Sequence, residues 1–248
     1  MTRTELVVDT PDGPCRATLH TPEGSGPWPG VLYYPDAGGV RGTIGGMADA
    51  VADQGFAVLL PDIYHRTPYA PFDTSTLFGD PEEFARLTAL AGSLTPTQVV
   101  TDARALVATL VARAEVAPGG VGAVGYCFGG SMAFRAAAAE PEHVAAVATF
   151  HGGNLAAADD PSSPHLLAGS ISAAVYVAAA TDDASFDADQ HARLQAACEE
   201  AGVPLTLETY PAAHGFAVPD NPTHDDGADR RHRETLAAFL SEHLRRRG

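Results

Sequence analysis

The chain has 248 residues, 45% of them hydrophobic, and carries a formal net charge of −16 at pH 7. This length and composition are typical of a globular protein, and we expect one α/β domain spanning residues 1–248. Such an acidic chain argues against nucleic acid or an anionic membrane as a partner, because like charges repel. It also makes long-range attraction of an anionic substrate weak.

Three cysteines, Cys15, Cys127 and Cys198, are too few and too scattered for a disulfide framework. The N-terminal residues have no apolar signal core, and no stretch approaches the ~18 apolar residues needed to span a bilayer. A reactive thiol suits a reducing compartment, so we expect the protein in the cytoplasm.

Strands and helices alternate along the chain, which predicts a mostly parallel central sheet flanked by helices on both faces. The first two strands, Glu5–Asp9 and Arg16–Thr21, are joined by the turn triplet Pro11-Asp-Gly13 and should pair antiparallel at an edge. The next expected elements are an interior strand, a helix and a strand, at Gly30–Pro35, Ile44–Gln54 and Ala57–Pro61.

Residues 64–95 interrupt this alternation. Their prolines predict irregular structure with only a short helical stretch near Glu82–Ala91. Because the segment follows the carboxyl end of a strand, where open α/β sheets bind ligands, we expect it to be an insertion that covers a pocket. A long amphipathic helix is predicted next, over Thr97–Ala114.

The stretch Val121–Gly130 carries the main functional signal. An apolar run typical of a buried strand ends in Gly125-Tyr-Cys-Phe-Gly129, and a helix-forming run begins at Ser131. This is the strand–turn–helix arrangement of a nucleophile elbow, with Cys127 where serine is usual. Glycines two residues away on each side avoid collisions with the neighbouring strand and helix. Backbone amides at a helix N-terminus favour a thiolate, although a small buried cysteine packed in a turn is the alternative.

Downstream, the expected elements are strands at His143–Phe150, Val175–Ala180 and Leu205–Tyr210, a helix over His191–Glu200 and a last helix over Ala228–Arg246. Asp182 and Asp183 follow the second of these strands, and His214 follows the third. In α/β-hydrolases the nucleophile, acid and histidine occur in this order, at the carboxyl edge of the sheet. Cys127, one of the two aspartates and His214 are therefore the predicted catalytic residues.

From about Glu5 to its C-terminus the chain resembles the dienelactone hydrolase family, a cysteine-nucleophile branch of the α/β-hydrolase fold. The motifs that carry the resemblance are Gly125–Gly130, His214–Phe216, Pro61–Tyr64 and Tyr34–Val40. It implies cleavage of a small lactone or ester of the carboxymethylenebutenolide kind through a thioacyl-enzyme, with no cofactor. The family register selects Asp183 over Asp182 as the acid of a Cys-His-Asp triad.

The resemblance also implies an oxyanion hole built from the backbone amides of Ala37 and Phe128. Asp36 stands where founding members have a glutamate that interacts with the thiol. We therefore expect Asp36 to contact Cys127, with a turn-capping role at Gly38-Gly39 as the alternative.

The expected substrate-binding residues are Tyr64, Tyr126, His151 and Phe216. His151 could equally be a hydrogen-bonded residue at a strand end. Founding members hold a substrate carboxylate with arginines, one of them four residues after the catalytic histidine, and that position here is Val218. Arg66 or Arg86 could substitute, but the expected substrate is a less acidic ester or lactone.

Other uses of the polar residues are less well supported. The sequence has no His-Glu-x-x-His or Cys-x-x-Cys pattern and no phosphate-binding loop, so no metal is expected. The cluster His224-Asp-Asp226 with His232 is typical of solvated residues around a loop. Ser131 lacks the flanking glycines of a nucleophile. The main alternative is a ligand-binding or redox-sensing protein with Cys127 as its reactive thiol.

Overall fold

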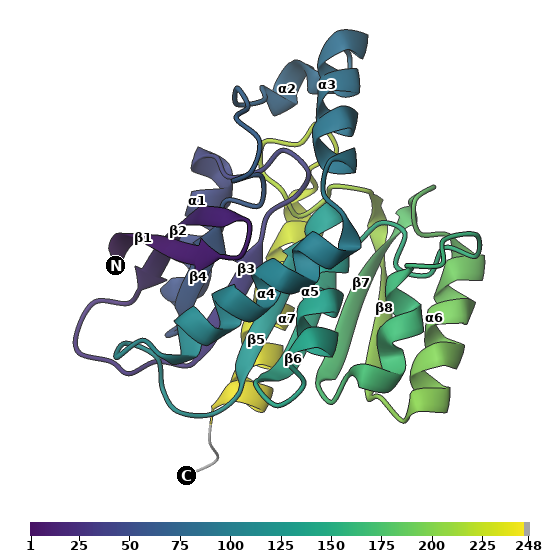
Figure 1. Cartoon of the computed structure of the whole chain (residues 1–248). Helices are drawn as coiled ribbons and strands as arrows, with labels where there is room; N and C mark the ends of the chain where they lie inside the picture. The colour runs from purple at the N-terminus through teal and green to yellow at the C-terminus, as the bar shows by residue number, and fades with distance from the viewer. Residues whose placement is uncertain (246–248) are drawn as a thin grey trace.

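The computed structural model describes residues 1–245, which are built around an eight-stranded sheet (Figure 1). The strands lie in the order β1-β2-β4-β3-β5-β6-β7-β8. The pairs β1–β2 and β2–β4 are antiparallel, and the other neighbouring pairs are parallel. The strand bounds are Thr2–Thr10 (β1), Gly13–Thr21 (β2), Gly30–Tyr34 (β3), Ala57–Pro61 (β4), Val121–Tyr126 (β5), Val144–Phe150 (β6), Ala174–Asp182 (β7) and Leu205–Ala213 (β8).

Helices cover both faces of this sheet, as Figure 1 shows. One apolar core lies between the sheet and α4, α5 and α6, and a second lies between the sheet and α1 and α7. The helix bounds are Gly42–Ala52 (α1), Thr74–Leu77 (α2), Pro81–Gly92 (α3), Pro96–Val111 (α4), Phe128–Ala139 (α5), Ala188–Ala201 (α6) and Asp226–Leu244 (α7), with a 3-10 helix, η1, at Pro164–Ser170. The predicted α/β-hydrolase architecture is confirmed.

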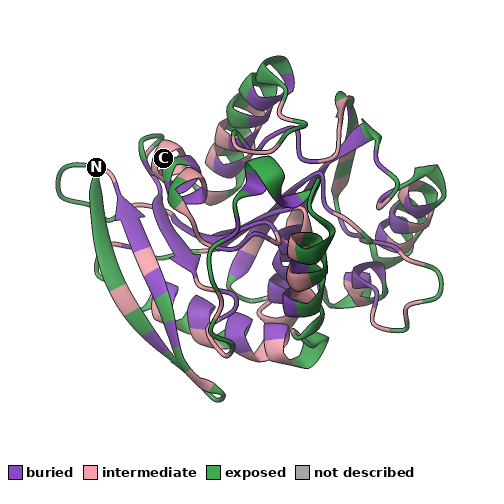
Figure 2. Ribbon diagram, turned by 90° about the horizontal axis from the view of Figure 1, so that it is seen from above, coloured by how far each residue is buried: buried purple, intermediate pink, exposed green. Residues whose placement is uncertain are grey.

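The alternation of side chains along β3 shows how one strand serves two cores. Leu32 and Tyr34 belong to the core under α4 and α5, whereas Val31 and Tyr33 belong to the core under α1 and α7. Successive side chains of a strand point to opposite faces, so a strand buried on both sides must be apolar throughout. Figure 2 shows the result: the central strands are buried along most of their length, and the helices are exposed on their outer sides.

Segment 64–95 contains more helix than the sequence indicated. Asp80 caps α3, since its side chain accepts hydrogen bonds from the backbone of Glu82 and Glu83, and Pro81 occupies the first turn. Proline is tolerated in the first turn of a helix because its missing N–H would have no helical partner there. Pro81 therefore begins a helix in this segment instead of excluding one, whereas Pro68 and Pro71 lie outside the helices. Both α2 and α3 rise above the carboxyl ends of the parallel strands (Figure 1).

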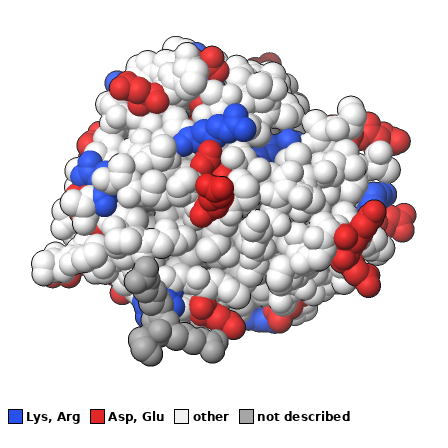
Figure 3. Space-filling view, turned by 60° about the horizontal axis from the view of Figure 1, so that its bottom comes forward, with Lys and Arg blue, Asp and Glu red and all other residues white. Residues whose placement is uncertain are grey.

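The remaining expected elements are confirmed with small changes in their bounds. The last helix is observed over Asp226–Leu244, and Arg246 of the expected helix lies outside the described residues. On the face shown in Figure 3, arginine and carboxylate side chains lie in small mixed groups separated by uncharged surface. Within residues 1–245, no helix is long and apolar enough to cross a bilayer.

Candidate active site

Four neighbouring parallel strands, β5 to β8, each end directly before a residue with a polar side chain. These residues are Cys127, His151, Asp183 and His214. Because parallel strands present their carboxyl ends at the same edge of a sheet, the fold brings these four positions together.

Cys127, His214 and Asp183 form a continuous line of contacts. The Cys127 Sγ atom lies 3.0 Å from His214 Nε2, and His214 Nδ1 lies 2.8 Å from Asp183 Oδ2. Asp182 is exposed at the end of β7, and its only bond to His214 is through its backbone carbonyl, which accepts from the His214 amide at 3.0 Å. The aspartate in contact with the imidazole is therefore Asp183.

Ser185 holds the Asp183 carboxylate from the other side. Its amide and its hydroxyl both donate to Asp183 Oδ1, at 2.9 and 2.6 Å, so the two carboxylate oxygens have separate partners. Sequence reasoning did not single out Ser185. The signal was present, since an aspartate followed two residues later by serine is a common turn pattern in which the carboxylate accepts from the backbone.

The charges of the site favour an imidazolium beside the thiol. Burial lowers the pKa of His214, but the hydrogen bonds to Asp183 and Cys127 outweigh it and raise the pKa to about 10. Burial likewise works against the Asp183 carboxylate, yet its bonds to His214 and Ser185 keep its pKa below the usual value. A positive imidazolium next to a sulfur atom stabilises the thiolate form of that sulfur.

The backbone at Cys127 is strained in the way that a nucleophile elbow requires. Its φ is +50° and its ψ is −116°, and it precedes the first residue of α5. A Cβ atom added at Gly125 would lie 2.1 Å from the Gly129 carbonyl oxygen, and one added at Gly129 would lie 2.3 Å from the Pro35 carbonyl oxygen. Only glycine fits at either position, so these two glycines avoid collisions with the neighbouring backbone, as the sequence predicted.

A cavity of about 610 Å³ opens above Cys127. The side chains at its base include Cys127, His151, Ser185 and His214. Ala37 and Phe128 also line it, and within residues 1–245 neither backbone amide donates a hydrogen bond to another group. Tyr64 lies behind the part of the cavity wall that Ala37 forms, and its hydroxyl donates to the Ala37 carbonyl at 2.9 Å.

A family model for the dienelactone hydrolase family matches residues 15–244. The chain belongs to the dienelactone hydrolase family. It is a hydrolase of that type. A relative in Methylorubrum extorquens named "Putative carboxymethylenebutenolidase" is 26% identical over 224 residues, which cover 89% of this chain and 74% of the relative.

Two solved structures illustrate the likeness within the family. One is the "Putative Dienelactone Hydrolase" of Klebsiella pneumoniae, with a TM-score of 0.83 and 20% identity, covering 98% of this chain and 99% of that one. The other is a "Dienelactone Hydrolase-like Promiscuous" phosphotriesterase from metagenomic libraries, with a TM-score of 0.75 and 27% identity, covering 98% of this chain and 100% of that one.

Asp36 does not behave as the family resemblance led us to expect. Its Oδ1 atom accepts from the Gly38 amide at 2.9 Å, and both carboxylate oxygens accept from Arg41, at 2.7 and 2.8 Å. The nearest hydrogen-bond partner of the Cys127 sulfur is instead His214. The turn-capping alternative is correct, and the expected contact with the thiol is wrong because Arg41 holds the carboxylate.

The positions of the arginines also differ from those of founding family members. Among the described residues that line the cavity, none is an arginine or lysine. Arg66 pairs with Asp12 and Asp102, and Arg86 pairs with Glu83. Val218 is fully buried. Neither Arg66 nor Arg86 takes the place of the missing carboxylate-binding arginine.

Three of the four expected substrate-binding residues do not line the cavity. Tyr64 lies behind the Ala37 wall, and Phe216 is fully buried against Tyr210, with the two ring centroids 5.0 Å apart. Tyr126 points to the opposite side of the sheet, into the core under α7. The expectation failed because aromatic residues near a strand end can face either core, and the motif does not specify which.

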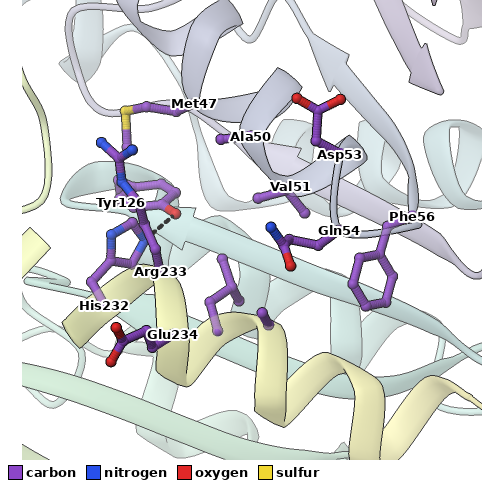
Figure 4. A pocket seen from close by; sticks show the side chains of 12 residues that line it. Met47, Ala50, Val51, Asp53, Gln54, Phe56, Tyr126, His232, Arg233 and Glu234 are labelled. Atoms are coloured by element: carbon purple, nitrogen blue, oxygen red, sulfur yellow. Dashed lines mark hydrogen bonds between the residues drawn. The ribbon is translucent and has the colours of Figure 1, made fainter. Parts of the chain in front are cut away.

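Tyr126 and His232 form a buried pair on that opposite side. The Tyr126 hydroxyl lies 2.7 Å from His232 Nε2, and His232 Nδ1 lies 3.1 Å from Asp229 Oδ1. Figure 4 shows the pair at the wall of a second cavity, of about 310 Å³, lined by residues of α1 and α7. His232 is only 3% exposed, so its expected assignment to a solvated cluster is wrong.

His151 does line the active-site cavity, although it is almost fully buried. Its ring packs edge-on against His214, with the ring centroids 5.2 Å apart, and neither ring nitrogen has a hydrogen-bond partner within residues 1–245. The alternative thus holds only for its backbone, whose amide donates to the Ala178 carbonyl at 2.8 Å, and not for its side chain. Burial, reinforced by the nearby His214, lowers the pKa of His151 and keeps this ring neutral.

The described residues offer no cluster of side chains that could hold a metal ion. Within residues 1–245, no group of three or more His, Cys, Asp or Glu side chains is arranged to hold a metal ion. The chemistry available at the site is that of a thiol, an imidazole and a carboxylate in series, next to two backbone amides. This set of groups is suited to nucleophilic attack on a carbonyl carbon.

Proposed function

We propose that this hydrolase cleaves a small lactone or ester through a thioacyl-enzyme formed on Cys127. The observation that carries the proposal is the line of contacts from Cys127 Sγ through the His214 ring to Asp183. A carboxylate, an imidazole and a nucleophile in series are the functional unit of acyl-transfer enzymes. The cavity above Cys127 gives a substrate access to it.

In the first half of the reaction, the Cys127 thiolate attacks the carbonyl carbon and forms a C–S bond. The carbonyl electron pair moves to the oxygen, which the Ala37 and Phe128 amides stabilise. When this oxyanion collapses, the C–O bond to the alcohol breaks and the leaving alkoxide takes a proton from His214 Nε2. With a lactone, the released hydroxyl remains attached to the acyl group.

In the second half, His214 is neutral and can accept a proton. It removes one from a water molecule while the water oxygen attacks the thioester carbon. Collapse of the second oxyanion breaks the C–S bond, releases a carboxylic acid and restores the thiolate–imidazolium pair. Asp183 holds the ring orientation throughout and stabilises its positive form.

The family relatives support a lactone or ester of the carboxymethylenebutenolide type as the substrate class. The lining of the cavity supports a substrate less acidic than that compound, since no arginine or lysine among the described residues reaches it. Without such a cation, a buried carboxylate on the substrate would lose its hydration and gain no counter-charge.

The other two cysteines favour hydrolysis over redox sensing. Cys15 and Cys198 are each about 1% exposed. Burial raises the pKa of Cys15 to about 12 and raises that of Cys198 as well, so neither is a ready thiolate for exchange with Cys127.

The test is turnover of a chromogenic ester by the wild-type protein and by Cys127→Ala, with Cys198→Ala as a matched control. We expect Cys127→Ala to lose turnover and Cys198→Ala to keep it, while circular dichroism shows both variants to be folded. Turnover that survives in folded Cys127→Ala would refute the proposal.

A further inference from the structure

The cavity above Cys127 has two chemically different halves. Its base, at the strand ends, carries the ionisable groups of the reaction, whereas its roof comes from segment 74–94 and is mostly apolar, with Thr74 and Thr88 as its polar side chains. The apolar roof residues are Leu77, Phe78, Phe84, Leu87, Ala91 and Leu94. A volume of about 610 Å³ corresponds to the liquid volume of roughly 20 water molecules, far more than a bare lactone ring occupies.

Helix α3 presents one apolar stripe to this cavity. Phe84, Leu87 and Ala91 are spaced three and four residues apart, which places them on the same side of a helix, and all three line the cavity. The charge of the helix lies elsewhere: Arg86 bonds Glu83 and stacks over the Phe72 ring, 3.8 Å from its centroid. Leu87 is 6% exposed and also belongs to the apolar core, whereas Phe84 is 48% exposed, so the stripe extends from the core to the open side of the cavity.

The mouth of the cavity is also apolar. Phe78 and Phe84 are 53% and 48% exposed, and their ring centroids are 6.3 Å apart. The other large apolar side chains exposed within residues 1–245 are Met1, Val7 and Leu166, none of which lines the cavity. Adjacent exposed aromatic rings beside a concave site are typical of a surface that binds an apolar ligand.

We infer that the substrate is an uncharged ester or lactone with an alkyl or aryl substituent, which lies along the α3 stripe while its carbonyl carbon meets Cys127. This inference rests on the proposed function for the reaction at Cys127 and adds the substituent class. The bottom of the cavity, around Cys127, is the polar end of the site, and the stripe of Phe84, Leu87 and Ala91 is its apolar end.

The inference predicts a dependence on chain length. Burial of one methylene group is worth ~0.8 kcal/mol, which corresponds to about a fourfold gain in kcat/KM per added methylene at 1.4 kcal/mol per decade. We therefore expect kcat/KM to rise about fourfold per methylene along the p-nitrophenyl esters from acetate to hexanoate. The monoester of adipic acid, which adds a terminal carboxylate to a hexanoate-length chain, should be a poorer substrate than the hexanoate.

The variant that tests the stripe is Phe84→Ser, which alters a half-exposed residue and should not prevent folding. Its matched control is Leu166→Ser, which removes an exposed apolar side chain from η1, away from the cavity. We expect Phe84→Ser to lower the ratio of hexanoate to acetate turnover several-fold and Leu166→Ser to leave it unchanged. A ratio near one in an active wild-type protein would overturn the inference and leave the proposed function intact.

A binding experiment distinguishes failure of this inference from failure of the proposed function. N-phenyl-1-naphthylamine, an uncharged apolar fluorophore, is titrated into the intact Cys127→Ala protein and into the same protein with Phe84→Ser added. Weaker binding in the double variant, displaced by methyl hexanoate, would support the apolar site even if no ester were hydrolysed. If no ester is hydrolysed and Phe84→Ser does not change binding of the dye, both the inference and the proposed function are wrong.

Discussion

The Arg41 guanidinium holds the Asp36 carboxylate by two hydrogen bonds, from Nη1 to Oδ1 at 2.7 Å and from Nη2 to Oδ2 at 2.8 Å. The same guanidinium also donates to both oxygens of Asp220, from Nε and Nη2, each at 2.8 Å. Asp36 precedes Ala37 in the loop after β3, and Asp220 belongs to the loop after His214. Arg41 therefore ties together two loops that shape the cavity.

Replacing Arg41 with methionine should destabilise the protein, because it leaves Asp36 with no counter-charge. Loss of one partner from a buried ion pair costs about 3–5 kcal/mol. We expect a loss at the lower end of this range, since the Asp220 side chain is 29% exposed. Urea unfolding measures this loss of stability. Arg104→Met is the control, because Arg104 is exposed and its ion pair with Glu140 is long, at 3.9 Å. Equal unfolding midpoints for the two variants would contradict the structural role of Arg41.

The pH dependence of turnover should reflect the raised pKa of His214. The pKa is about 10 in place of the ordinary 6.5, so the imidazolium that protonates the leaving alkoxide should persist into alkaline solution. We expect kcat/KM to fall only as the pH approaches about 10. Asp183→Asn removes the carboxylate that supports the imidazolium and should move this fall towards neutral pH. An identical alkaline limb in both proteins would show that Asp183 does not act on the ring.

The same shift links folding to pH. Because His214 has a higher pKa in the folded protein, it binds its proton more tightly there than in the unfolded chain. Its contribution to the free energy of unfolding is therefore complete below pH 6.5 and is lost as the pH rises to about 10. Urea unfolding of wild type and Asp183→Asn across this interval should show a larger loss for the wild type.

Ser185→Ala should lower activity modestly by loosening Asp183. The hydroxyl bond at 2.6 Å is lost, but the amide bond at 2.9 Å remains. A single hydrogen bond contributes about 0.5–1.5 kcal/mol, so kcat/KM should fall about 2- to 10-fold, and the alkaline limb should shift slightly towards neutral pH. Ser162→Ala is a close control, because Ser162 bonds Asp160 in the same way, at 2.8 and 2.6 Å, outside the cavity. Equal activities of the two variants would argue against the role of Ser185.

Tyr126→Phe tests the corrected position of that side chain. Removing its hydroxyl leaves His232 Nε2 buried without a partner, which should cost about 1–3 kcal/mol of unfolding free energy. Since the hydroxyl does not reach the active-site cavity, KM should remain unchanged. A large rise in KM with unchanged stability would restore Tyr126 as a substrate-binding residue.

The order of the chemical groups could be predicted from the sequence, because each group directly follows a strand with a clear apolar pattern. The choice between Asp182 and Asp183 could not be derived from that pattern, because successive residues at a strand end point in different directions. The family register selected Asp183, the residue that contacts His214. Tyr126 was misplaced for the same reason, since its direction depends on which core fills the space beside it.

The role of Arg41 in joining two loops could not be identified from local pattern, although Asp36 is only five residues before it. Its partner Asp220 is 179 residues away in the sequence, and a surface arginine and a clamping arginine look the same in a single chain. Segment 64–95 was underestimated because proline was taken to break helices, whereas Pro81 occupies the first turn of α3. Local signals thus predicted the elements and the catalytic order, and the contacts between distant loops required the structure.

The most direct test of the central claim is to detect the acyl group on Cys127. The wild-type protein is mixed with a slowly turned over ester, quenched in acid during turnover and digested with trypsin. The peptide Ala114–Arg135 contains Cys127 as its only cysteine. We predict that this peptide gains the mass of the acyl group, that fragmentation places it on Cys127, and that hydroxylamine removes it. Continued turnover with no acyl group on Cys127, or with the group on Ser131, would contradict the account.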